Sequence, residues 1–216
     1  MEQMDLVLGE PVAATLHETM KITIDAALLK GLLAFAGRQD IRYYLNSILL
    51  ETTETSAIVV GTDGNTLAVH RVSADDVEGH RPGLQVIIPR AALESVKPRR
   101  SGRTQTVSIE LGTEVITVVG ETTASAAPVD AKYPDWRRVL PATVSGEPGQ
   151  VNPRFFARVG LLADAVLGKG TSPVMFFNTP GPLLIQFDEN TLAAVMPLRD
   201  KPVFTGLPTW VNGGQP

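Results

Sequence analysis

The sequence predicts an α+β fold in which helices cover one face of mostly antiparallel sheets. Two observations predict it. A strand-like run, a helical run and further strand-like runs follow one another three times, at intervals of roughly 50 residues. Turn-forming residues separate these runs, since the 216 residues include 19 Gly and 16 Pro. We therefore expect three β-α-β-β-β units.

The first unit is expected to begin with a strand over residues 21–24. Asp25 then provides the N-cap of a helix over residues 26–36, in which leucines recur at helical spacing. Gly37 suits the left-handed position that ends such a helix. Asp63-Gly64 is a hairpin turn signal further along. The strands of this unit are expected over residues 45–52, 57–61 and 66–72.

The second unit repeats the pattern with a shorter helix. A strand over residues 84–88 leads into a helix over residues 90–97. Its strands are expected over residues 106–111, 114–119 and 122–129.

The third unit follows a connector, residues 130–150, that is rich in Pro and Gly. Asn152 and Pro153 are typical of the N-cap and first residue of a helix, which is expected to continue to about residue 167. Its strands are expected over residues 174–177, 183–187 and 192–197.

The composition excludes several function classes. There is no Cys, and the three His residues (His17, His70 and His80) form no close pair, so no thiolate or helical His metal site is expected. No nucleophile–base pair or Gly-rich phosphate loop stands out, so we expect no catalytic residue, metal or cofactor. The protein is expected not to be an enzyme.

Charge and hydropathy restrict the partners and the cellular location that we expect. The net charge of −4 argues against a protein that simply coats nucleic acid, but a total says nothing about where the charges lie. No apolar run approaches the roughly 20 residues of a membrane-spanning helix, and the first residues lack the pattern of a secretory signal. We expect a cytoplasmic protein without a membrane partner.

Five segments carry a resemblance to a known family. They are QDIRYYLN at residues 39–46, GTDGNTLAV at 61–69, VIIPR at 86–90, KYPDWRRVLP at 132–141 and VMPLR at 195–199. Their order and spacing resemble the bacterial DNA polymerase III β subunit, the sliding clamp. The resemblance implies the DNA-clamp fold, a ring with antiparallel sheets outside and helices inside.

The resemblance also divides the chain. Residues 20–141 are similar to a complete clamp domain, the middle one, and residues 142–199 to the second half of the third, a half clamp domain of one unit. Residues 1–19 are then an N-terminal lead-in and residues 200–216 a C-terminal tail. No counterpart of the first domain, or of the first half of the third, is recognised.

A first set of residues is expected to contact duplex DNA without sequence preference. Basic residues on or near the predicted helices would supply the positive lining of a ring, and the resemblance adds one Gln and two Tyr. The set is Lys30, Arg38, Gln39, Tyr43, Tyr44, Arg90, Lys97, Arg100, Arg154 and Arg158. The alternative is that the cations lie on solvated faces and the tyrosines pack.

A second set is expected to bind short linear motifs of DNA polymerases and repair proteins. The resemblance implies an apolar pocket between the second and third domains, suited to Leu and Phe anchors. Its residues are Leu45, Thr62, Gly64, Asn65, Thr66, Leu67, Pro134, Arg138, Val139, Asn152, Phe155, Pro182, Ala194, Val195, Met196, Pro197 and Leu198. The alternative is that they close a core between two packed units.

The chain departs from the family pattern at the pocket. Asn65-Thr66 stands where the family usually has His-Arg, so a cation at the rim is expected to be lost, and Ala194 replaces a larger aliphatic residue. Both changes predict an altered or weaker motif preference. Residues 207–211 extend past the family's usual end and could fill the pocket, the alternative being a disordered end.

A half domain leaves an unpaired sheet edge, so a homo-oligomer is expected. Pairing of third units across a two-fold axis would give a tetrameric ring, and a dimer is the simpler arrangement. The function expected is a processivity factor that encircles DNA, with a separate clamp loader. The alternative is a non-encircling adaptor or regulator that binds clamp-motif peptides.

Overall fold

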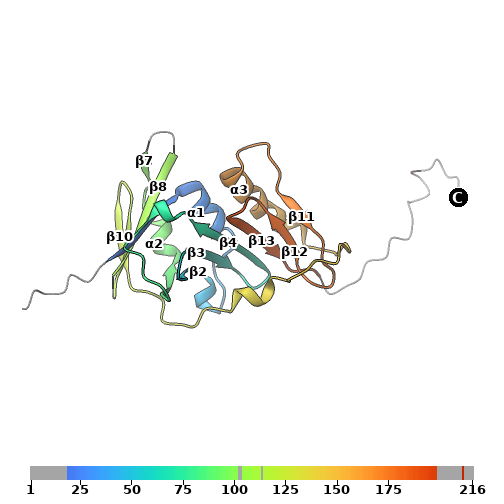
Figure 1. Ribbon diagram of the computed structural model, residues 1–216, viewed down its shortest axis with the longest axis horizontal. Helices are drawn as coiled ribbons and strands as arrows, with labels where there is room; N and C mark the ends of the chain where they lie inside the picture. The colour runs from blue at the N-terminus through green and yellow to red at the C-terminus, as the bar shows by residue number, and fades with distance from the viewer. Residues whose placement is uncertain (1–18, 102–103, 113, 199–210, 212–216) are drawn as a thin grey trace, which may run out of the picture.

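The computed structural model describes residues 19–101, 104–112, 114–198 and 211. It contains two antiparallel sheets with helices between and beside them (Figure 1). This confirms the predicted fold class. Three units are distinguished below: unit 1 (residues 20–72), unit 2 (residues 85–126) and unit 3 (residues 156–195).

The larger sheet has seven strands and joins units 1 and 3. Its strands, in spatial order, are β11 (Val174–Phe176), β12 (Leu183–Gln186), β13 (Thr191–Val195), β4 (Thr66–Val72), β3 (Ala57–Thr62), β2 (Ser47–Thr52) and β6 (Gln85–Pro89). The junction between the units is the antiparallel pair β13–β4, in which Thr191 lies opposite His70 and Val195 opposite Thr66.

The smaller sheet belongs mainly to unit 2. Its strands are β10 (Thr123–Ala126), β9 (Ile116–Val119), β8 (Thr104–Leu111), β1 (Met20–Asp25) and β5 (Val77–Glu78), with β7 (Arg99–Ser101) paired to one end of β8. Units 1 and 2 exchange their opening strands. β1 of unit 1 pairs with β8, and β6 of unit 2 pairs with β2.

The helices are short. They are α1 (Ala26–Leu33), α2 (Arg90–Glu94) and α3 (Phe156–Val166), with 3₁₀ turns η1 (Tyr43–Leu45), η2 (Ala74–Asp76), η3 (Trp136–Val139) and η4 (Pro153–Phe155). The predicted N-caps are confirmed, because Asp25 accepts from the N–H groups of Ala27 and Leu28, and Asn152 accepts from that of Arg154.

α1 and α3 lie side by side at the unit 1–unit 3 junction (Figure 1). Gly31 permits the close approach, because a Cβ there would lie 2.9 Å from Leu162 Cδ1 and 3.1 Å from Leu162 Cα.

Two expectations are corrected. Gly37 does not adopt the left-handed conformation, since it is absent from the positive-φ glycines of the described chain. The carbonyls at the end of α1 are instead satisfied by the Arg90 side chain, and Gly37 is required because a Cβ would lie 2.8 Å from Asn46 Oδ1. Unit 3 also lacks its opening strand, because residues 142–152, all described, contain none.

The central strands β2, β3 and β4 of the larger sheet are buried on both faces, which explains their continuous apolar runs. Alternate residues Ile48 and Leu50 of β2 face the main core with α1, while Leu49 faces a second core. That second core is covered by the connector, whose Tyr133 and Trp136 are buried against the sheet. Residues 131–140 of the connector are thus a packed layer, whereas residues 142–148 are exposed.

Candidate peptide-binding pocket

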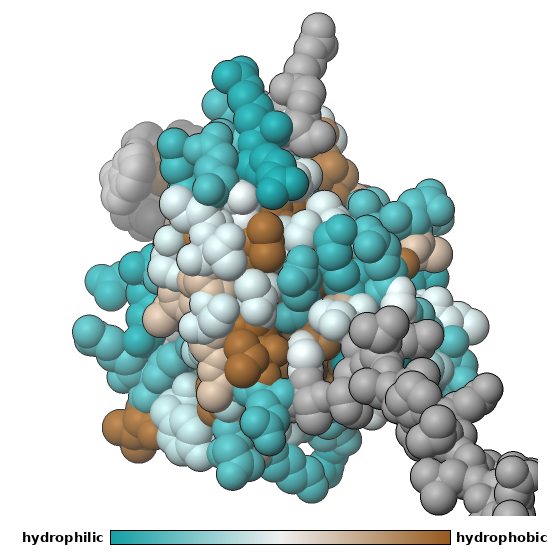
Figure 2. Space-filling view, turned by 90° about the vertical axis from the view of Figure 1, so that its left-hand side faces the viewer, coloured by the Kyte–Doolittle hydropathy of each residue, from teal (hydrophilic) through white to brown (hydrophobic). Residues whose placement is uncertain are grey.

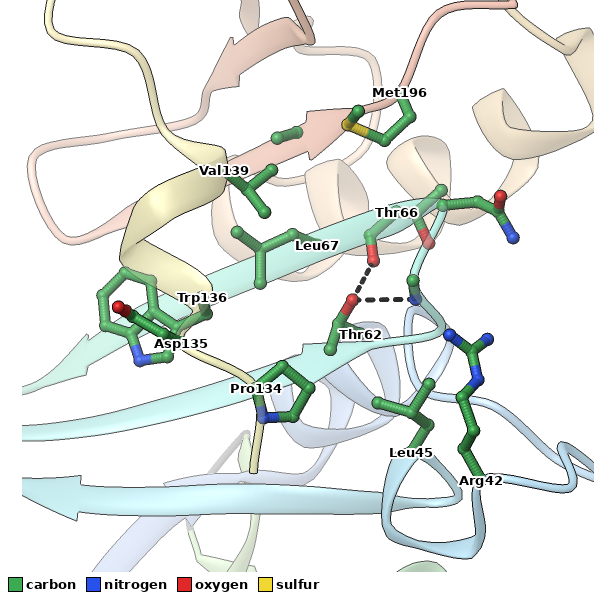
Figure 3. Close-up of a pocket in the computed structure, with 13 residues that line it drawn as sticks. Arg42, Leu45, Thr62, Thr66, Leu67, Pro134, Asp135, Trp136, Val139 and Met196 are labelled. Atoms are coloured by element: carbon green, nitrogen blue, oxygen red, sulfur yellow. Dashed lines mark hydrogen bonds between the residues drawn. The ribbon is translucent and has the colours of Figure 1, made fainter. Parts of the chain in front are cut away.

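A cavity of about 160 Å³ opens at the unit 1–unit 3 junction, on the face of the sheet that carries the connector. Four segments meet there: the loop and turn before β2, the β3–β4 turn, η3 of the connector and the end of β13 (Figure 3). The lining is mainly apolar. Its residues are Arg42, Leu45, Thr62, Gly64, Asn65, Thr66, Leu67, Pro134, Asp135, Trp136, Val139, Ala194 and Met196.

The β3–β4 turn forms one corner and is held by its own side chains. Asp63 Oδ1 accepts from the backbone N–H groups of Asn65 (2.9 Å) and Thr66 (2.8 Å). Thr62 Oγ1 donates to the Thr66 carbonyl (2.7 Å) and accepts from the Gly64 N–H (3.1 Å), as Figure 3 shows. Gly64 has φ +85°, where a side chain would be strained, so the turn requires glycine.

Unit 3 secures the same turn from outside. Arg158 of α3 donates from Nη1 to Asp63 Oδ2 and to Thr66 Oγ1. The Met196 N–H donates to the Asn65 carbonyl at 2.9 Å. Burial alone would raise the pKa of Asp63, but the bonds from Arg158 and the two backbone N–H groups outweigh it and lower that pKa. The turn is therefore a fixed corner shared by two units.

The connector wall is anchored to β2, on the face of the sheet that it covers. Glu51 is buried on β2, pairs with the Arg137 guanidinium and accepts from Trp136 Nε1 at 3.4 Å. The Arg137 guanidinium also stacks over the Trp136 ring, 4.1 Å from its centroid. These contacts fix η3, so Pro134 and Val139 present a rigid apolar wall to the cavity.

Arg42 places a positive charge at the rim. Its Nε and Nη2 donate to the two carboxylate oxygens of Asp40 at 3.0 and 2.7 Å, and Nη2 also donates to the Asp63 carbonyl at 3.1 Å. These hydrogen bonds from Arg42 lower the pKa of Asp40 to about 2. Arg42 thus lines the rim of the pocket as a cation that is paired with Asp40.

Most of the predicted pocket residues line the cavity, and seven do not. The seven are Arg138, Asn152, Phe155, Pro182, Val195, Pro197 and Leu198. Val195 is a clear correction, because strand alternation turns it into the main core while its neighbours Ala194 and Met196 face the cavity. Phe155 packs beside the main core, and Asn152 caps η4.

Three lining residues were missed by sequence reasoning: Arg42, Asp135 and Trp136. All three lie inside the segments that carry the family resemblance. Their proximity to residues already assigned to the pocket was the available signal.

The residues predicted to contact DNA separate into two groups. One group has exposed side chains: Lys30, Arg38, Gln39, Tyr43, Lys97, Arg100 and Arg154, with Tyr44 half-buried. Lys30 and Arg38 line a common cavity of about 470 Å³ between α1, α2 and β8. Lys97 is paired with Glu121 at 2.7 Å, and Tyr43 donates to the Asp130 carbonyl at 3.1 Å.

The other group, Arg90 and Arg158, is turned into the protein, which corrects the prediction for both. Arg90 is 8% exposed, donates to the carbonyls of Leu33, Ala36 and Gly37, and pairs through Nη1 with Glu94 at 2.8 Å, so its guanidinium is engaged within the protein. Arg158 is engaged by Asp63 and Thr66 and lies over the Phe155 ring.

Within the described residues, no group of three or more His, Cys, Asp or Glu side chains is arranged to hold a metal ion. No helix in that part of the chain is long and apolar enough to cross a membrane. Residues 207–210 of the tail, which could fill the pocket or form a disordered end, lie outside the described residues.

Comparisons with known proteins agree with this geometry. Residues 19–135 match the family described as the DNA polymerase III beta subunit, central domain. The Beta sliding clamp of Proteus mirabilis is 34% identical over 128 residues, which cover 56% of this chain and 34% of the relative. That of Pseudomonas putida is 40% identical over 105 residues, 48% of this chain and 28% of the relative. The chain spans about a third of the length of the curated relatives it matches.

Solved structures extend the likeness beyond the central domain. The Helicobacter pylori beta clamp bound to a DNA ligase peptide matches with a TM-score of 0.65 at 16% identity, covering 87% of this chain and 68% of that one. A sliding clamp from Pseudomonas aeruginosa matches with a TM-score of 0.59 at 21% identity, covering 91% and 70%. At these low identities, the structural matches establish the fold alone. The family match covers more than half of the sequence, and the chain belongs to the DNA polymerase III β subunit, or sliding clamp, family.

Proposed function

We propose that this protein is a sliding-clamp-type binding protein that holds short linear motifs of replication and repair proteins in the pocket at the unit 1–unit 3 junction. The observation that carries the proposal is that the turn, the connector wall and the end of β13 all meet in one cavity, although the sequence match covers only about a third of the curated relatives. The Helicobacter pylori clamp, which shares the fold, was solved with a DNA ligase peptide.

The chemistry of the lining favours a peptide with aliphatic or aromatic anchors. Leu67 lies in the middle of the lining, with Val139 and Met196, whose thioether is adaptable, on one side of it and Pro134 and Leu45 on the other (Figure 3). Burial of one Leu or Phe anchor contributes about 1.5–3 kcal/mol, and the Arg42 guanidinium offers a partner for a carboxylate or carbonyl at the rim.

A matched pair of methionines tests the proposal. Met196 and Met175 are both 39% exposed, but only Met196 lines the pocket. Met196→Lys is expected to weaken a labelled peptide with Leu and Phe anchors by about tenfold or more in fluorescence polarisation, because a buried anchor would face a charge. Met175→Lys should leave the affinity unchanged. Equal affinities for the two variants, or no binding by the unaltered chain, would reject peptide binding at this pocket.

We further propose that an oligomer of the chain encircles duplex DNA and so acts as a processivity factor. The exposed cations Lys30, Arg38 and Arg154 support this, because an acidic protein can still present a basic surface locally. Encirclement predicts retention on closed circular DNA and release when the circle is cut. Binding that is the same on linear and circular DNA, or absent from both, would favour a non-encircling adaptor.

A further inference from the structure

β11 is an unfinished sheet edge. It pairs on one side with β12, with Met175 opposite Ile185, and no strand of the described residues lies on its other side. The connector bonds to the chain just past the end of β11, where the Gly146 N–H donates to the Phe177 carbonyl at 3.0 Å and the Thr179 N–H donates to the Glu147 carbonyl at 3.1 Å. The four consecutive side chains Val174, Met175, Phe176 and Phe177 are all exposed, Val174 by 57%. A run of large apolar side chains on an open edge is a template for pairing with another strand.

The same position is filled in the other two units. β2 is the first strand after α1 and is flanked by β6, while β8 is the main strand after α2 and is flanked by β1. In each case the added strand is antiparallel and comes from the other unit of the pair. β11 is the first strand after α3 and lacks this neighbour. By analogy with the β2–β6 and β8–β1 pairs, we expect one antiparallel strand beside β11.

The free edges β6 and β10 carry no such run of exposed large apolar side chains. Along β6, the N–H of Val129 in the connector donates to the Ile87 carbonyl at 2.9 Å. β10, at the edge of the smaller sheet, carries the small residues Thr, Ala, Ser and Ala. The face of the molecule at that end shows mostly hydrophilic and neutral side chains, with apolar ones in small separate patches (Figure 2). Large apolar side chains in succession are a feature of β11.

A strand that pairs with β11 would meet a surface without charged side chains. Residues 170–187, which contain β11 and β12, include no Asp, Glu, Lys or Arg. Such a segment neither repels a second copy of itself nor selects a charged partner. Because Met175 faces the same side of the sheet as its buried partner Ile185, and Val174 and Phe176 face the other side, self-pairing places apolar against apolar on both faces.

We propose that β11 is a self-association edge: two copies of the chain pair their β11 strands antiparallel about a two-fold axis. Each copy then supplies the strand that the other lacks, and the two seven-stranded sheets become one. This interface is on the opposite side of unit 3 from the β13–β4 junction and does not rest on the peptide pocket.

The test measures the mass of the full chain by light scattering and sedimentation. At tens of micromolar the expected mass is at least twice 23.1 kDa, and a ring around DNA would need a second interface between such dimers. Val174→Lys and Met175→Lys are each expected to raise the dimer dissociation constant by about tenfold or more, because like charges meet across the axis. Val115→Lys is the matched control, since Val115 is a similarly exposed valine (48%) beside β9 and should leave the mass unchanged. Met196→Lys should also remain dimeric.

Cross-linking tests the strand pairing itself. The chain has no Cys, so single substitutions to Cys at residues 174 to 177 report only on the new interface. A two-fold antiparallel pair predicts disulfide formation that peaks at one position and falls on either side, with none for Val115→Cys. A monomer at all concentrations, a dimer unaffected by both lysine variants, or a chain that dimerises only after truncation at residue 198 would overturn the proposal.

Discussion

The two sides of unit 3 differ. On the β13 side the unit is joined to unit 1 by a ladder of paired strands, by α1–α3 packing and by Arg158, and the peptide pocket lies there. On the β11 side the last strand is exposed and apolar. The pocket needs only the joined side. The pocket can therefore form at the unit 1–unit 3 junction while the β11 side of unit 3 has no neighbouring strand among the described residues.

The largest effect is expected from the interior of units 1 and 2, onto which unit 3 packs. Arg90→Met leaves the carbonyls of Leu33, Ala36 and Gly37 without their donor in a buried site. We expect urea unfolding to show a loss of about 3 kcal/mol. Arg38→Met removes an exposed cation nearby and should change stability by less than about 0.5 kcal/mol. Equal losses in the two variants would contradict the capping role of Arg90.

The helix contact at the joined side is expected to come next. Gly31→Val places carbon atoms within about 3 Å of Leu162, so α3 must move away from α1. We expect a loss of about 2 kcal/mol in unfolding free energy and weaker peptide binding, because α3 carries Arg158 to the pocket corner. Gly160→Ala on the same helix pair meets no atom within 4 Å and is expected to be neutral or to stabilise by up to about 1 kcal/mol.

A smaller effect is expected from Arg158→Met. Loss of the bonds to Asp63 and Thr66 should lower stability by about 1–2 kcal/mol at neutral pH. The pKa of Asp63 should rise, which NMR titration of its carboxyl carbon would detect. The lowered pKa of Asp63 contributes stability that is present above its ordinary pKa of 3.8 and lost as the pH falls through the lowered value. The acid dependence should therefore be shallower in the variant, and an unaltered dependence would count against the ion pair.

The smallest effect concerns pH at the β4–β13 junction. Burial lowers the pKa of His70, whose Nδ1 lies 2.9 Å from Thr191 Oγ1, although Asp188 and Asp76 oppose the shift. The folded state then holds neutral His70 while the unfolded state takes up a proton below the ordinary pKa of 6.5. Stability should fall as the pH drops below that value. His70→Gln should remove this part of the dependence between about pH 7 and pH 5. A slope that survives the substitution would assign the effect to other groups.

The sequence was a good guide wherever the determinants are local. The strand–helix pattern, the N-caps at Asp25 and Asn152 and the glycine turn at Gly64 were all predicted from neighbouring residues. The end of α1 was not, because its carbonyls are satisfied by Arg90 from another helix. Arg90 was assigned to the DNA-contacting surface because it lies on a predicted helix.

In the pocket, too, the features set by local sequence were predicted and those set by distant residues were not. Its turn and the end of β13 were predicted from family-like segments. Trp136 was missed, because its place depends on Glu51, a residue 85 positions away on β2. Val195 was assigned to the wrong face, because strand register decides which of two adjacent apolar residues points to the cavity.

The central claim is that this short chain contains a complete peptide pocket at the unit 1–unit 3 junction. The most direct test is a titration of the isotope-labelled full chain with a Leu/Phe-anchored peptide, followed through its amide NMR signals. The account predicts that the signals of Gly64, Leu67 and Met196 shift together and that those of Val115 and Met175 stay in place. Saturating peptide that leaves Gly64, Leu67 and Met196 unchanged, or shifts that gather elsewhere on the molecule, would contradict it.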